Sequence, residues 1–131
     1  MSQENVDQFM KAVDAINRAD IPGALGFMDP EIRFEHRLDA LQGDYTGIEG
    51  VRGFFNDFVE HFEAVQIDCP DVRDLGNRVL ALGSVHATGR GSGAETELPF
   101  TVVAAFRNGR LTHYIDFGDR DQALEASGLR E

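Results

Sequence analysis

The spacing of apolar side chains divides the chain into an N-terminal part with helical periodicity and a later part with the two-residue period of β-strands. Near the N-terminus, apolar side chains recur every three or four residues on one helical face, namely Val6, Phe9, Met10, Val13 and Ile16. A second stripe with this spacing comprises Val51, Phe54, Phe55, Phe58, Val59 and Phe62. Both stripes predict amphipathic helices that cover a core.

Capping residues indicate where the helices begin and end. Asp20 followed by Pro22 predicts a second, short helix that carries Met28 and ends at Asp29-Pro30. Thr46 and Glu49 have the spacing of a capping box, which predicts the start of the third helix.

The rest of the chain alternates between apolar and polar residues, as strands do. The expected strands run over residues 32–36, 65–69, 78–90, 97–107 and 110–117. Asn108-Gly109 is a strong signal for a two-residue hairpin turn. The Gly-rich residues 89–93 are interpreted as a hairpin turn, because no Lys-Ser/Thr pair and no helix follow them. Asp119 is expected to cap a short final helix that ends at Gly128.

Helices grouped ahead of a strand meander indicate an α+β fold, with helices packed on one face of an antiparallel sheet. We expect a single domain over residues 1–131, because no repeat, low-complexity segment or linker interrupts the pattern.

The charge and cysteine content of the chain exclude several classes of binding partner and site. The 12 basic and 23 acidic residues give a net charge of −11, which argues against nucleic acid and anionic membrane surfaces as partners. Cys69 is the single cysteine, so no intrachain disulfide and no cysteine-based metal site is expected. The polar N-terminus is unlike a signal peptide, and no apolar run is long enough to span a bilayer. These features predict a cytoplasmic protein.

Four segments resemble the NTF2-like superfamily, and within it the SnoaL-like (polyketide cyclase-like) proteins. They are residues 29–34, 45–52, 89–100 and 109–124, which follow the family's order along most of the chain. The resemblance implies a cystatin-like cone, in which a curved antiparallel sheet is wrapped by N-terminal helices around a pocket.

The family geometry implies which side chains face the pocket. On the first strand these are Ile32, Phe34 and His36, and on a middle strand Leu82, Ser84 and His86. The remaining wall would be formed by Phe100, Val102, Ala104, Tyr114 and Asp116.

Ionisable residues in phase with apolar ones are the candidate catalytic groups. A buried His beside a buried Asp offsets the cost of burial and forms a general acid/base pair. Asp116 is the first candidate, with His86 as its partner, and His36 helps to orient a substrate. The alternatives are that Asp116 is bound to a backbone amide or to Arg90. The expected substrate-binding residues are Tyr114, Phe34, Ser84, Phe58, Phe100 and Val102.

Two branches of the superfamily offer closer comparisons. Residues 114–119 resemble the last-strand motif of limonene epoxide hydrolases, whose aspartate matching Asp116 activates water. The rest of that branch's pattern is missing, since this chain departs from it at Phe34, His36, Ser84 and His86. His36 falls about where ketosteroid isomerases have their catalytic base, but Val103 stands near the position of their oxyanion-hole acid. Neither epoxide opening nor classical ketosteroid isomerisation fits these departures. The resemblance to SnoaL-like proteins favours a ring-closing or isomerising reaction over hydrolysis.

The leading hypothesis is a cofactor-free isomerase or cyclase acting on a small apolar molecule. Its rivals are a non-catalytic protein that binds such a molecule and a structural dimerisation module. No metal is expected, although His36, His86 and Asp116 form a conceivable ligand set. Leu111, Ile115 and Phe117 lie apolar on the expected outer face of the last strand, with His113 among them, which predicts a homodimer packed sheet to sheet.

Overall fold

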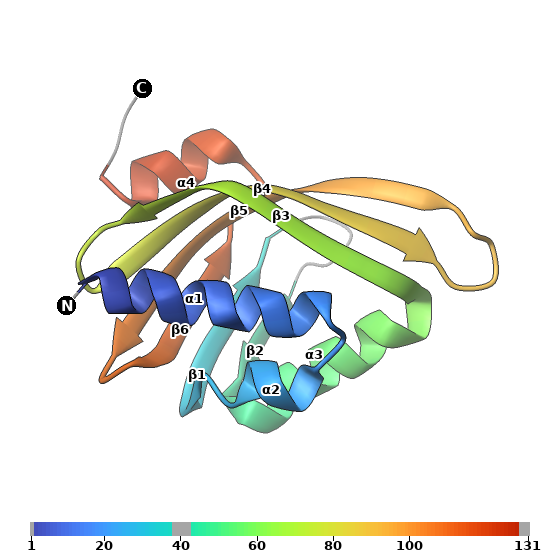
Figure 1. The fold of residues 1–131 in the computed structure, drawn as a ribbon, viewed down its shortest axis with the longest axis horizontal. Coiled ribbons are helices and arrows are strands. Elements are labelled where there is room, and N and C mark those ends of the chain that lie inside the picture. The colour runs from blue at the N-terminus through green and yellow to red at the C-terminus, as the bar shows by residue number, and fades with distance from the viewer. Residues whose placement is uncertain (1, 38–42, 129–131) are drawn as a thin grey trace.

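A curved six-stranded sheet organises the part of the chain that the computed structural model describes, residues 2–37 and 43–128. In chain order the elements are α1 (Ser2–Asn17), α2 (Ile21–Leu25), β1 (Met28–His36), β2 (Gly43–Thr46), α3 (Gly47–His61), β3 (Phe62–Asp74), β4 (Arg78–Gly89), β5 (Glu95–Arg107), β6 (Arg110–Asp116) and α4 (Arg120–Ala126) (Figure 1). The expected α+β class is confirmed.

The strands lie in the order β2-β1-β6-β5-β4-β3. All neighbours are antiparallel except β1 and β6, which run parallel. The sequence predicted an antiparallel sheet, so the parallel pairing of β1 with β6 differs from the prediction. The long chain between the two strands permits the parallel direction, because a parallel pair requires a long crossover connection, and tertiary packing decides it. The short strand β2 was not predicted, since its four residues carry no apolar alternation.

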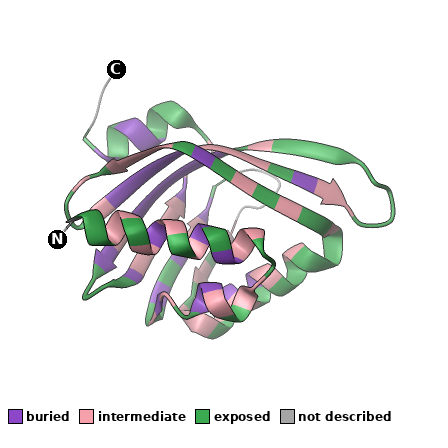
Figure 2. Ribbon diagram, in the orientation of Figure 1, coloured by how far each residue is buried: buried purple, intermediate pink, exposed green. Residues whose placement is uncertain are grey.

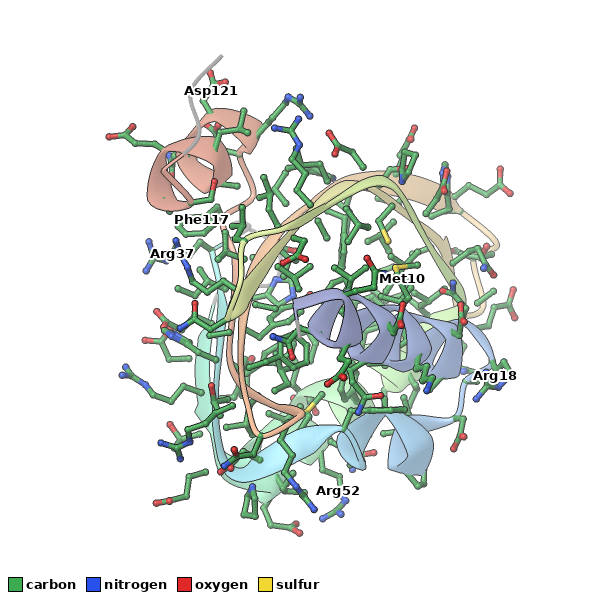
Figure 3. All side chains as sticks on the ribbon, turned by 60° about the vertical axis from the view of Figure 1, so that its left-hand side comes forward. Met10, Arg18, Arg37, Arg52, Phe117 and Asp121 are labelled. Atoms are coloured by element: carbon green, nitrogen blue, oxygen red, sulfur yellow. The ribbon has the colours of Figure 1, made fainter. Side chains whose placement is uncertain are left out.

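Three helices cover the concave face of the sheet. Helix α1 crosses this face, while α2 and α3 lie beside it nearer to β1 (Figure 1). Buried residues occur on both the helices and the strands, as the purple segments show (Figure 2). Their side chains form one core. Its fully or nearly fully buried members include Phe9, Val13, Ile32, Phe34, Val51, Phe54, Val79, Ala81, Val102 and Ala104. The helical stripes predicted from the sequence therefore do face the sheet.

The fourth helix covers part of the convex face. Ala123 and Leu124 of α4 pack there against Leu80, Leu82 and Val103 in a second buried cluster. Burial of each large aliphatic side chain in it contributes about 1.5–3 kcal/mol. Strand β4 is consequently apolar on both faces. The expectation that Leu82 faces the pocket is wrong, because the inward side chains are those of the alternate set to which Ala81 belongs.

The caps and boundaries agree only partly with the sequence prediction. Asp119 caps α4 as expected, since its side chain accepts hydrogen bonds from the backbone N–H groups of Asp121 and Gln122. Thr46 is the N-cap residue of α3 but makes no capping hydrogen bond through its side chain, so the predicted capping box is wrong. Met28 begins β1 rather than ending α2, and Phe62 begins β3 rather than ending α3.

An irregularity in β6 changes which of its residues face inward. The pairing with β5 shifts between Ala105 and Phe106, so that Leu111 and His113 pair with consecutive β5 residues. Thr112 is the extra residue of this bulge. Leu111 therefore lies buried in the main core rather than on the outer face, which corrects the sequence expectation.

No helix in the described ranges is long and apolar enough to cross a membrane.

Candidate functional site

The concave face of the sheet and the helices line a partly open cavity of about 590 Å³. Its wall is mainly aromatic and aliphatic, and the aromatic members include Phe9, Phe27, Phe34, Phe54, Phe55, Phe58, Phe62, Phe100, Phe106 and Tyr114. Size and apolar character are those of a small-molecule pocket. His36 and Asp116 are also part of this wall, and both are buried.

The parallel pairing of β1 with β6 places the two polar groups side by side. Phe34 lies opposite Tyr114 in the register, and His36 opposite Asp116. Since residues two apart on a strand share a face, all four side chains point to the same side of the sheet. The result is a row of two aromatic rings continued by an imidazole and a carboxylate.

Local hydrogen bonds fix the carboxylate of Asp116. The Thr101 hydroxyl donates to Oδ1 over 3.1 Å, and the Gly118 backbone N–H donates to the same oxygen over 3.1 Å. Oδ2 faces His36 instead, 3.9 Å from its Nε2. Oδ1 is thus held by hydrogen bonds within the protein. The other is directed at the imidazole.

His36 sits in an aromatic environment. Its ring centroid lies 5.0 Å from that of Phe54 and 5.7 Å from that of Phe34. Burial lowers the pKa of His36 below its usual 6.5, while the nearby carboxylate of Asp116 acts in the opposite direction. The imidazole is therefore neutral at neutral pH. Within the described residues, its Nδ1 is buried and has no hydrogen-bond partner.

Tyr114 brings a hydroxyl to the same wall. Its ring stacks on Phe34 with centroids 4.2 Å apart and an interplanar angle of 1°. Burial raises the pKa of Tyr114 well above its usual 10, and the charge of Asp116 adds to this effect. The hydroxyl thus stays protonated over the whole physiological range and can donate a hydrogen bond to a ligand.

The structure does not bring His86 to Asp116. His86 is exposed on the other side of β4, where its Nε2 lies 3.7 Å from Glu97 Oε1 and 3.4 Å from Ser84 Oγ. Neither His86 nor Ser84 lines the cavity, whereas Val85 between them does. The expected contact is wrong because both faces of β4 carry apolar residues, so alternation alone did not fix which face is inward.

The other expected residues lie closer to their predicted positions. Phe34, Phe58, Phe100 and Tyr114 line the cavity. Val102 is fully buried in the core directly opposite Asp116, but it is not part of the cavity wall. Arg90 does not bind Asp116; its guanidinium donates to the backbone carbonyls of Val59 and Phe62.

Two contributors were missed by sequence reasoning. Phe54 was assigned only to the core stripe, yet its ring contacts both Phe34 and His36 at the cavity wall. Thr101 was not considered because it is out of phase with the inward-facing residues of β5. Its hydroxyl within the otherwise apolar residues 98–106 is the sequence signal by which it could have been found.

The remaining histidines lie away from the cavity wall. His113 Nε2 lies 2.5 Å from Glu35 Oε2, and this interaction is the largest cause of the lowered pKa of Glu35. His61 Nδ1 lies 2.8 Å from the backbone carbonyl of Asp57. Within the described parts of the chain, no group of three or more His, Cys, Asp or Glu side chains is placed to hold a metal ion.

Comparison with known families agrees with this geometry. The family model of the SnoaL-like domain matches residues 7–114. The chain belongs to the SnoaL-like domain family. No curated protein matches this SnoaL-like chain.

Solved structures share the fold of this SnoaL-like domain. An NTF2-like protein of unknown function from Burkholderia pseudomallei K96243 is 25% identical, with a TM-score of 0.80 over 93% of this chain and 95% of that one. TerC, co-crystallised with polyporic acid, is 20% identical, with a TM-score of 0.79 over 95% and 98% of the two chains. A protein with a ketosteroid isomerase-like fold from Catenulispora acidiphila, in complex with trimethylamine, is 15% identical, with a TM-score of 0.76 over 94% and 93%.

Proposed function

We propose that this SnoaL-like protein binds a small, largely apolar molecule in its cavity and transfers a proton on it, as a cofactor-free isomerase or cyclase. The observation that carries the proposal is the buried pair of His36 and Asp116 in the wall of an otherwise mainly apolar cavity. A base placed there can act on a substrate from which water is largely excluded.

The proposed roles follow from the protonation states and hydrogen bonds. The neutral imidazole of His36 and the carboxylate of Asp116 are the candidate bases for a proton on carbon. Tyr114, whose hydroxyl stays protonated, is the candidate donor to an oxygen that gains negative charge during the reaction. A ligand oxygen lying about 2.8 Å from both His36 Nε2 and Asp116 Oδ2 would bridge the present 3.9 Å gap.

Solvent exchange tests the proposal without a known substrate. The protein is incubated in deuterated water with a panel of apolar ketones and enones, and deuterium incorporation at carbon is followed by NMR. We expect Asp116→Asn to slow exchange about 100-fold or more, the usual contribution of a positioned general base. His36→Gln should also slow it. His86→Gln is the matched control, because it makes the same change in an exposed histidine and should leave the rate unchanged.

A second function is a non-catalytic carrier or sensor of a hydrophobic small molecule. The mainly apolar wall favours it, as do the small molecules bound by the TerC crystals and by the Catenulispora protein. Binding of panel compounds without any exchange above the Asp116→Asn variant would support this function and contradict catalysis. Independently of the ligand, we also propose that the chain forms a homodimer, and analytical sedimentation of the purified chain tests this by measuring its mass in solution.

A further inference from the structure

The buried carboxylate of Asp116 lacks a positive countercharge within the described chain. Its side chain is 2% exposed, and the only ion-pairing partner that the described residues provide is His36. Because burial keeps His36 neutral at neutral pH, this partner brings no charge. A buried charge without an opposite charge is costly, and the hydrogen bonds from Thr101 and Gly118 both fall on Oδ1. Oδ2 is therefore the atom that a cationic ligand group would neutralise.

Aromatic rings lie beside this carboxylate. Tyr114 precedes it by two residues on the same face of β6, and the ring of Phe34 stacks on Tyr114. Phe54 packs against both Phe34 and His36, with centroids 5.2 and 5.0 Å apart. Faces of aromatic rings attract organic cations, most strongly where water is excluded. A carboxylate beside such rings is the combination that recognises an alkylammonium group.

The charges elsewhere on the wall do not oppose a cation at Asp116. Arg18 lies near Asp20, and Arg90 donates to backbone carbonyls at the junction of α3 and β3. Arg18 follows α1 and Arg90 follows β4, and the acidic Glu63, near the start of β3, is also part of the wall. The net charge of −11 attracts cations to the molecule as a whole.

We propose that the ligand of this cavity is a largely apolar amine, whose ammonium group pairs with Asp116 Oδ2 against the rings of Phe34, Phe54 and Tyr114. The inference rests on the proposed function in taking this cavity as the ligand site, and it names the chemical class of the ligand. With Asp116 engaged by the ammonium group, the neutral His36 is the base that remains free for proton transfer.

Three probes with one aromatic body test this inference, namely naphthylmethylamine, naphthylmethanol and naphthoate. Calorimetric titration at neutral pH measures their affinities, and NMR shifts of cavity residues locate them. We expect the amine to bind about tenfold or more tightly than the alcohol, the usual effect of a hydrogen bond to a charged group, and the acid to bind most weakly. Asp116→Asn should reduce the preference for the amine to about twofold while the alcohol keeps its affinity.

Glu63→Gln is the matched control variant. It removes the same charge from the cavity wall and leaves the same net charge as Asp116→Asn, so general attraction of cations changes equally. The amine preference should survive in Glu63→Gln. Circular dichroism checks that Asp116→Asn folds, and the amide oxygen of Asn can still accept from Thr101 and Gly118.

The possible results separate this inference from the proposed function. If the alcohol binds as tightly as the amine in the wild-type protein, the amine proposal is wrong, although the cavity remains a ligand site. If Glu63→Gln loses the preference as fully as Asp116→Asn, the preference comes from general charge and the proposal is equally overturned. If none of the three probes shifts the cavity residues, both proposals fail.

Discussion

His36 and Asp116 face each other across the parallel junction of β1 and β6, with Nε2 and Oδ2 3.9 Å apart. This separation exceeds a hydrogen bond, so the two groups do not share a proton, and the carboxylate acts on the pKa of the imidazole through space. The pairing of β1 with β6 sets it, because the register places the two residues directly opposite. The strand-end hydrogen bonds of Asp116 then orient its carboxylate, and the aromatic neighbours exclude water from the imidazole.

The first prediction concerns the pKa of His36 in the variant Asp116→Asn. The carboxylate raises the pKa of His36 while burial lowers it, and burial is the larger effect. Removal of the negative charge should therefore lower the pKa of His36 further. A pH titration of the imidazole signals by NMR measures this. Glu97→Gln removes a carboxylate near His86 instead and should leave His36 unchanged. An unchanged or raised pKa of His36 in Asp116→Asn would contradict the assigned pairing.

A second prediction links His36 to the pH dependence of stability. In the unfolded chain its pKa is near 6.5, and in the folded protein it is lower, so the unfolded state binds more protons as the pH falls. The stability associated with neutral, buried His36 is thus complete above pH 6.5 and declines as the pH falls below it. Glu35 and Asp71 have pKa values lowered from 4.5 and 3.8 respectively. The stability that their ionised forms contribute is therefore lost only as the pH falls below these values, in a separate and more acidic range than that of His36.

Urea unfolding between about pH 7 and pH 5 tests this dependence. His36→Phe, which keeps an aromatic ring beside Phe54, should remove most of the decline in the free energy of unfolding. His86→Gln alters an exposed histidine and should retain it. An equal decline in wild type and His36→Phe would show that another group is responsible.

The fold was predictable because several independent patterns agreed. Two helical stripes, the Asn108-Gly109 turn and the Asp119 cap each matched the structure. The boundaries at Met28 and Phe62 failed, because an apolar residue fits the end of a helix and the start of a strand equally well. The parallel direction of β1 and β6 could not be predicted either, since it is decided by tertiary packing.

The site was predictable where one strand face is apolar and the other polar. On β1, Ile32, Phe34 and His36 alternate with charged residues, so their inward direction was unambiguous. On β4 the same reasoning failed for His86, because α4 buries the second face of that strand. The predicted outward direction of Leu111 was wrong for another reason, because the bulge at Thr112 reverses the alternation within β6.

The two predicted caps provide a third test. The Asp119 side chain holds the first turn of α4, so Asp119→Ala should reduce the free energy of unfolding by about 0.5–2 kcal/mol. Thr46→Ala is the matched control, because the Thr46 side chain makes no capping bond to α3, and it should cost clearly less. Thermal or urea unfolding of both variants gives the comparison. Equal losses would mean that Thr46 does cap α3 in solution.

The fourth prediction concerns Gly83, which lies opposite a bulge in β3. The pairing of β3 with β4 skips between Asp68 and Asp71, at Pro70, which has no N–H to donate to the neighbouring strand. A Cβ at Gly83 would lie 1.9 Å from the Asp68 carbonyl oxygen and 2.7 Å from Cys69 Cα. Both are backbone atoms, so the strands would have to separate.

Gly83→Ala should therefore lower the free energy of unfolding by about 1–3 kcal/mol. Gly53→Ala makes the same substitution at an exposed position inside α3, where a Cβ meets nothing within 4 Å. It should stabilise the protein by about 0.5–1 kcal/mol, because glycine loses more backbone entropy than alanine in a helix. Urea unfolding measures both changes. Tolerance of alanine at Gly83 would show that β3 does not follow the bulged path, and the position of Cys69 in the core would then be in error.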